Sequence, residues 1–223
     1  MLRRIGCAFL LAGVSLLVCG CTASDWSWPS GSPSSPTRTI TATGGPDTEL
    51  ARRENESGLA FLAKGDLDNA RDAFLKAIDA DPEFAPAQNN LGKVFLKQGD
   101  LHEAARRFDE ARRLMPDHAG PCNNLGLVYE EAWRRKMSLS RGTPATENTR
   151  RELNRAIELY RQAIGLDADA IEYKANLVRA LIHRGDRTDE VRLLLKQVIK
   201  TDTRPPWLTW ARRELATMGR GPE

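Results

Sequence analysis

Residues 85–118 have the sequence APAQNNLGKVFLKQGDLHEAARRFDEARRLMPDH, which contains two amphipathic segments. In the first segment Leu91 and Phe95 are four residues apart, and in the second Ala104, Phe108 and Ala111 repeat at helical spacing. This spacing places each set on one face of an α-helix, so that each helix has an apolar stripe to bury. The stretch therefore predicts two helices that pack against each other.

The boundaries of these two helices are also marked in the sequence. Gly99 and Asp100 separate the segments, which predicts a tight turn between antiparallel helices. Pro116 ends the second helix, because its ring cannot continue the hydrogen-bond ladder. A single pair of this kind cannot bury its apolar faces alone, so several pairs must stack.

The same pattern recurs along the chain with a period of 34 residues. Its copies are predicted at residues 51–84, 85–118, 119–170 and 171–205. In the third copy the apolar set of the second helix returns 18 residues late, as Ala156, Tyr160 and Ala163. This delay predicts an insertion near residues 134–151 and two elongated helices. A last amphipathic helix, at residues 206–218, is expected to cover the open end.

These repeats resemble those of the tetratricopeptide (TPR) family, over about residues 48–218. The resemblance implies an all-α fold, a right-handed TPR superhelix or α-solenoid of about four helix pairs plus a C-terminal capping helix. It also implies an extended concave groove, lined by the first helix of each pair, and no enclosed pocket. The implied function is that of a scaffold or adaptor that binds a segment of another protein.

The resemblance also identifies the residues expected to line the groove. Asn90, Asn124 and Asn176 occupy the same place in successive repeats and resemble the asparagine ladder with which some TPR proteins hold a peptide backbone. A carboxamide is both donor and acceptor, and so matches a peptide group. The alternative is that these asparagines only brace the next repeat, and both interpretations stay open. The predicted groove residues are Asn55, Asn89, Asn90, Lys93, Lys97, Asn123, Asn124, Asn176 and Arg179, with Glu130, Glu131 and His183 nearby.

Binding of chaperone tails through the carboxylate-clamp pattern of some TPR proteins is not expected. That pattern needs a lysine and an asparagine in the first helix, where this chain has Asn55 and Leu59.

The insertion in the third repeat has two interpretations. Trp133, Met137 and Leu139, beside the basic Arg141, could form a docking knob, an apolar anchor with a basic rim. Alternatively, the two long helices cover each other's apolar faces. The pattern favours the second interpretation for Trp133 and the first for Leu139 with Arg141.

The first 21 residues have the features of a secretion signal. Two arginines precede an apolar run over residues 5–18, which is short for a membrane span. The run ends in Leu17-Val18-Cys19-Gly20-Cys21, which resembles the lipoprotein box of bacterial lipoproteins. The resemblance implies a signal peptide over residues 1–20, cleavage before Cys21, and lipidation of this cysteine with several acyl chains such as palmitate. A plain secretory signal cleaved nearby is the alternative.

Residues 21–47 are predicted to form a tether. They are rich in Ser, Pro, Thr and Gly and show no helical or strand period. Thr22 follows the lipidated cysteine, where the family rule requires aspartate for retention at an inner membrane. The resemblance therefore favours the outer membrane, facing the periplasm, of a bacterial cell envelope.

Several function classes are excluded at this level. The chain of 223 residues has 33 basic and 30 acidic residues, a formal charge of +3, which gives no indication of a nucleic-acid partner. It contains no HExxH, CxxC or GxSxG motif and no phosphate-binding glycine loop. No enzymatic activity, cofactor or metal is therefore expected. Cys122 is expected to be a buried, inert thiol.

Together these features predict a membrane-anchored adaptor that binds an extended peptide of an envelope protein. The layout resembles that of pilotins and of adaptors for envelope hydrolases. The alternative is a structural lipoprotein that forms homodimers and has no peptide ligand.

Overall fold

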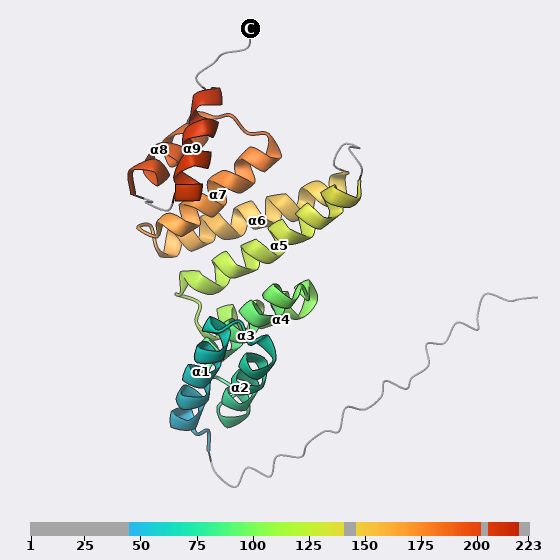
Figure 1. Cartoon of the computed structure of the whole chain (residues 1–223), viewed down its shortest axis with the longest axis vertical. Helices are drawn as coiled ribbons and strands as arrows, with labels where there is room; N and C mark the ends of the chain where they lie inside the picture. Colours follow the sequence, from blue (N-terminus) through green and yellow to red (C-terminus); the bar gives the residue numbers. More distant parts are fainter. Residues whose placement is uncertain (1–44, 141–145, 202–204, 219–223) are drawn as a thin grey trace, which may run out of the picture. The chain divides into compact units, whose positions relative to one another are not determined.

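A computed structural model of the protein describes residues 45–140, 146–201 and 205–218. These residues form nine α-helices and no strand (Figure 1), which confirms the predicted all-α fold of four helix pairs and a single last helix. The predicted signal peptide, Cys21, nearly all of the tether and Arg141 lie outside the described residues. The helices are α1 (Thr48–Ala63), α2 (Leu67–Ala80), α3 (Ala85–Gln98), α4 (Leu101–Leu114), α5 (Ala119–Leu139), α6 (Glu147–Leu166), α7 (Ile171–Arg184), α8 (Asp189–Thr201) and α9 (Pro205–Met218).

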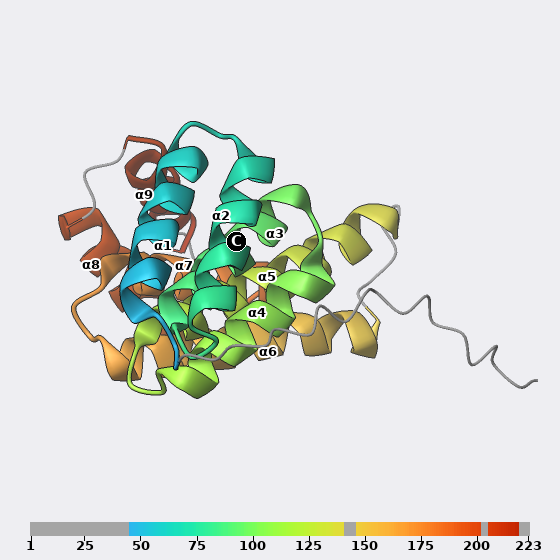
Figure 2. The ribbon, with the colours of Figure 1, turned by 90° about the horizontal axis from the view of Figure 1, so that it is seen from below.

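The helices pack in chain order, as Figures 1 and 2 show. The pairs are α1 with α2, α3 with α4, α5 with α6, and α7 with α8, and α9 packs on α8. The first helices of successive pairs also touch one another, α1 with α3, α3 with α5, and α5 with α7. These four first helices form one face, here named the A-helix face. No described helix has the length and apolar character that a membrane crossing requires.

Glycine and aspartate define the turns within the pairs. Gly65, Gly99 and Gly185 have φ angles of 77°, 83° and 98°, a left-handed conformation that ends each first helix and that glycine adopts without strain. Asp66 and Asp100 come next, and each side chain accepts the backbone N–H three residues later. This cap starts the second helix of the pair. In the third pair α5 continues as helix through Trp133, the counterpart of Gly99, and ends at Leu139.

A glycine on the first helix and an aromatic ring on the second set the distance between the helices of a pair. A Cβ atom added to any of these three glycines would lie 2.5–2.6 Å from the nearest ring carbon. The three pairs are Gly58 with Phe74, Gly92 with Phe108, and Gly126 with Tyr160. In the fourth repeat the buried residues Val178 and Leu195 take these places.

The insertion in the third repeat lengthens both helices without changing this packing. Helices α5 and α6 have 21 and 20 residues, whereas α3 and α4 have 14 each. Lys136 and Glu152 form an ion pair of 2.6 Å between the extended parts, and Leu153 is buried there. The extra residues therefore add helix beyond the Gly126–Tyr160 contact and leave the contact itself in place.

Replacing Gly92 by alanine should destabilise the protein. The new methyl group would lie 2.6 Å from Phe108 Cε1, and relieving this overlap costs about 1–3 kcal/mol of unfolding free energy. The gain in helix propensity, at most about 1 kcal/mol, does not compensate. Urea unfolding followed by circular dichroism measures the change. The control is Gly120→Ala, since nothing lies within 4 Å of a methyl group at that position. A Gly92→Ala protein as stable as this control would contradict the packing argument.

Candidate functional site

The asparagines of the A-helix face hydrogen-bond to one another between repeats. In each bridge the Nδ2 atom of an asparagine donates to the Oδ1 atom of an asparagine in the preceding repeat. The bridges are Asn90 to Asn55 at 2.9 Å, Asn124 to Asn89 at 2.9 Å, and Asn176 to Asn123 at 2.8 Å. All six predicted groove asparagines therefore tie α1 to α3, α3 to α5, and α5 to α7.

Burial limits what these asparagines can offer to a ligand. Asn55, Asn90, Asn123 and Asn176 are only 2–7% exposed. Buried amides must be hydrogen-bonded, and each bridge satisfies one donor and one acceptor. The contacts between repeats support the bracing interpretation, and direct contact of the asparagines with a peptide stays a prediction.

The ends of the repeat array interrupt this pattern. The first repeat has the exposed Glu56 where the later repeats have Asn90, Asn124 and Asn176, and its α1 is the first of the described helices. The fourth repeat has Ala175 where the earlier repeats have an accepting asparagine. The sequence does carry a signal for these bridges, because asparagine recurs at two adjacent positions of the first helices. One position holds the accepting asparagine and the next holds the donating asparagine.

A cleft of about 820 Å³ opens on the A-helix face. All of its lining residues come from α3, α5, α7 and the turn after α3. They are Leu96, Lys97, Gln98, Gly99, Leu127, Glu130, Glu131, Arg134, Arg135, Arg179 and His183. Two predicted groove residues, Lys97 and Arg179, thus lie in the cleft, together with the three residues expected nearby.

Glu130 is a buried carboxylate on the floor of this cleft. Arg179 donates to both of its oxygens, at 2.6 and 2.7 Å, and the Tyr160 hydroxyl donates to Oε2 at 2.7 Å. His183 Nδ1 lies 3.4 Å from Oε1. Burial alone would raise the pKa of Glu130, but hydrogen bonds from Arg179 and His183 and the charge of Arg179 outweigh it and lower the pKa to about 2. Burial and the neighbouring carboxylate raise the pKa of Tyr160 well above its usual range.

The Glu130 cluster, made of Glu130, Tyr160, Arg179 and His183, joins the third repeat to the end of the domain. Trp133 of α5 stacks on His183 of α7, with ring centroids 4.9 Å apart. The guanidinium of Arg179 lies 5.4 Å from the ring centroid of Trp207 on α9. Arg179 is therefore committed to Glu130 and to packing, which sequence spacing alone did not indicate.

The predicted docking knob divides into two parts. Trp133 is half-buried in the cluster just described, and Met137 is also half-buried. Leu139 is 80% exposed at the end of α5. Arg141, its proposed basic neighbour, lies outside the described residues.

Two lysines of α3 lie one helical turn apart on the A-helix face. Lys93 is half-buried and donates to Asn90 Oδ1 at 3.2 Å, and burial lowers its pKa. Lys97 is exposed. Neither lysine forms an ion pair with any of the described residues. These cations are available to a ligand, whereas Arg179 is not.

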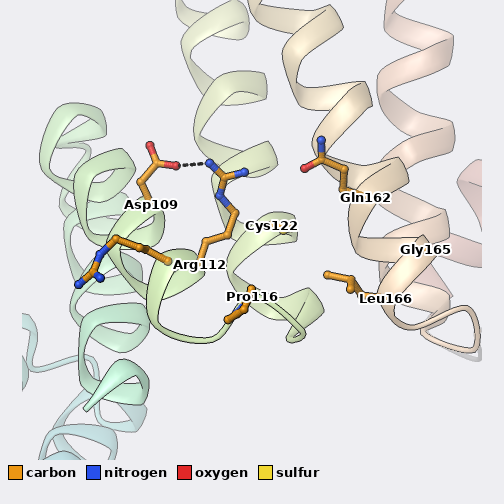
Figure 3. A pocket seen from close by; sticks show the side chains of 8 residues that line it. Asp109, Arg112, Pro116, Cys122, Gln162, Gly165 and Leu166 are labelled. Atoms are coloured by element: carbon orange, nitrogen blue, oxygen red, sulfur yellow. Dashed lines mark hydrogen bonds and ion pairs between the residues drawn. The ribbon is translucent and has the colours of Figure 1, made fainter. Parts of the chain in front are cut away.

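A second hollow, of about 560 Å³, lies between α4, the start of α5 and the end of α6 (Figure 3). Arg112 donates to Asp109 at 2.9 Å beside it. Cys122 is 3% exposed, which confirms its predicted burial, and burial raises the pKa of its thiol. A protonated thiol is a poor nucleophile and metal ligand. Among the described residues no group of His, Cys, Asp and Glu side chains could hold a metal ion.

The first two repeats match models of TPR repeats. A family model described as "TPR repeat" matches residues 58–99, and one described as "Tetratricopeptide repeat" matches residues 85–118. TPR domains bind protein partners and generally act as scaffolds without catalytic activity of their own. The described helices therefore have the fold of a TPR solenoid, which in TPR proteins generally serves as a protein-interaction scaffold.

Solved structures with the same fold support this assignment. A thermophilic TPR protein in Thermus thermophilus has a TM-score of 0.61 at 20% identity, over 75% of this chain and 80% of that chain. MamA has a TM-score of 0.57 at 19% identity, over 76% and 81%. The first TPR of Spaghetti, bound to an HSP90 peptide, has a TM-score of 0.51 at 17% identity, over 63% and 98%. A search of curated proteins finds no match.

The carboxylate of Glu130 should make the stability of the protein sensitive to acid. Its pKa is lowered by folding, so its contribution is complete above about pH 4.5 and is lost as the pH falls toward 2. The contribution amounts to about 3 kcal/mol. We expect the unfolding free energy of the wild type to fall more steeply between pH 5 and pH 2 than that of Glu130→Gln, measured by urea titration at each pH.

The matched control for this measurement is Glu158→Gln, because Glu158 is an exposed carboxylate of α6 whose one ion pair among the described residues is with the exposed Arg155. Its pH profile should follow the wild type. If Glu130→Gln also followed the wild type, the ion pair would not hold α5 to α7 as described.

Proposed function

We propose that this protein is a membrane-anchored adaptor that binds an extended segment of a partner protein along its A-helix face. The observation that carries this proposal is the cleft, because every residue that lines it belongs to the A-helix face or to the adjoining turn. An open cleft bounded by several helices suits a strand-like segment better than a small molecule, which needs enclosure.

The state of the groove residues supports a preformed binding face. The asparagine bridges and the Glu130 cluster hold the first helices together without a ligand. A rigid face loses little conformational entropy on binding. The residues that remain to contact a partner are exposed or partly exposed, among them Leu59, Lys93 and Lys97.

A peptide ligand is also supported by one similar structure, the first TPR of Spaghetti, which is bound to an HSP90 peptide. The carboxylate-clamp pattern is not proposed for this chain, since Asn55 is buried and bonded to Asn90 and Leu59 is exposed on the A-helix face. A partner in the envelope, such as a secretin subunit or a cell-wall hydrolase, follows from the proposed lipid anchor.

The two lysines of α3 should be needed for partner binding. We expect the full chain with Lys93→Ala and Lys97→Ala to capture its partner from bacterial envelope extract at least several-fold less well than the wild type. The control is Lys196→Ala with Lys200→Ala, since these lysines have the same spacing and are exposed on α8, a second helix. Quantitative mass spectrometry of the captured proteins is the measurement.

Thermal unfolding of both variants checks that the fold is unchanged. Equal capture by the lysine variant and its control would count against the A-helix face. A stable dimer in light scattering, with no specific capture at all, would instead support a homodimeric structural role.

The proposed anchor depends on one cysteine. In a bacterial host, Cys21→Ser should abolish incorporation of labelled palmitate and move the protein from the membrane fraction to the soluble fraction. Several acyl chains are needed for firm anchoring, and they attach at this residue. Cys19→Ser is the matched control and should still be labelled. Loss of label from Cys19→Ser, with Cys21→Ser still labelled, would show that Cys19 is the lipidated residue and that cleavage precedes it.

A further inference from the structure

The extension of α5 forms part of the wall of the cleft. In a repeat of the length of the second one, the first helix would end at about Ala132, the counterpart of Gln98. Because α5 continues to Leu139, Arg134 and Arg135 are added to the lining. Arg135 Nη1 donates to the carbonyl oxygen of Gly99 at 2.9 Å, which fixes this wall against the turn after α3.

The charges in the cleft leave an excess of positive charge. Glu130 is neutralised by Arg179. Glu131 is the second carboxylate, and it pairs with both Arg134 and Arg135, whose Nε atoms lie 2.8 and 2.9 Å from its oxygens. One carboxylate therefore faces two guanidinium groups.

Lys97 adds a further cation to the lining, and it has no ion-pair partner in the described part of the chain. Leu96 and Leu127, both half-buried, line the same cleft. The site thus combines two apolar side chains with a rim of exposed cations, Lys97, Arg134 and Arg135.

We propose that this cleft is a subsite for an acidic side chain of the bound protein segment. This inference rests on the proposed function and specifies its ligand. The carboxylate of a partner Asp or Glu lies between Lys97 and Arg134, and its aliphatic part packs on Leu96 and Leu127. The insertion in the third repeat thus supplies the arginines that select an acidic residue of the partner.

A selection from random short peptides displayed on phage tests the subsite with the full chain as bait. Peptides selected by the wild type should be enriched in Asp and Glu. Lys97→Glu with Arg134→Glu should lose this enrichment and select Lys and Arg instead, since both residues are exposed and the charge of the rim is reversed. Lys196→Glu, a charge reversal outside the cleft, should select the same peptides as the wild type.

A double-mutant cycle on one selected peptide locates the contact. Changing its acidic residue to the amide should weaken binding to the wild type about two- to fivefold, the range for an exposed ion pair. The same change should have no effect on binding to Lys97→Ala with Arg134→Ala. Fluorescence anisotropy measures both affinities.

The outcomes separate this inference from the proposed function. Selected peptides without acidic enrichment, whose binding still needs Lys93, would overturn the acidic subsite and leave peptide binding intact. An amide change that weakens binding equally to the wild type and the double variant would also overturn it. If no peptide is selected at all, both the subsite and the proposed peptide-binding function are wrong.

Discussion

The close contact between a glycine and an aromatic ring inside each of the first three helix pairs is the constraint on which the other features depend. Gly58, Gly92 and Gly126 leave room for a ring that would otherwise overlap a side chain. The ring is then completely buried, and apolar burial of this size is a main source of stability. Because this contact sets the spacing of the pair, it also sets how the first helices of successive pairs meet. The third pair keeps the same contact although an insertion of 18 residues interrupts the repeat period.

Polar groups then tie the pairs together on the A-helix face. The proposed binding face must stay accessible, so it cannot rely on a thick apolar layer for its rigidity. Three asparagine bridges join successive first helices, and the Glu130–Arg179 pair joins α5 to α7. Separating the two partners of a buried ion pair would leave an uncompensated charge in the interior, which is costly in free energy. The pair therefore favours the one arrangement of α5 and α7 in which both partners meet. The proposed ligand contacts are made by residues of this face that take no part as partners in the asparagine bridges or the Glu130–Arg179 pair. They are chiefly Lys93, Lys97 and the arginines of the α5 extension.

Much of this architecture could be predicted from the sequence. The helices, the turns at Gly99 and Gly185, and the elongation of α5 and α6 follow from local chain properties and from the 34-residue period. The predicted groove residues also lie on the A-helix face, because a helix with a known apolar stripe has a known opposite face. The lipid anchor at Cys21 and the envelope location stay predictions from the N-terminal sequence.

By itself, then, the sequence determined the class of fold, the number of repeats and the candidate face. Only the tertiary structure decided how the polar residues of that face are used. Asn124, a predicted peptide contact, bonds to Asn89, and Arg179, a predicted groove cation, is held by Glu130. The physical reason is that helical periodicity gives the direction of a side chain on its own helix. The partner depends on the rotation and offset between two helices, which arise from packing across repeats.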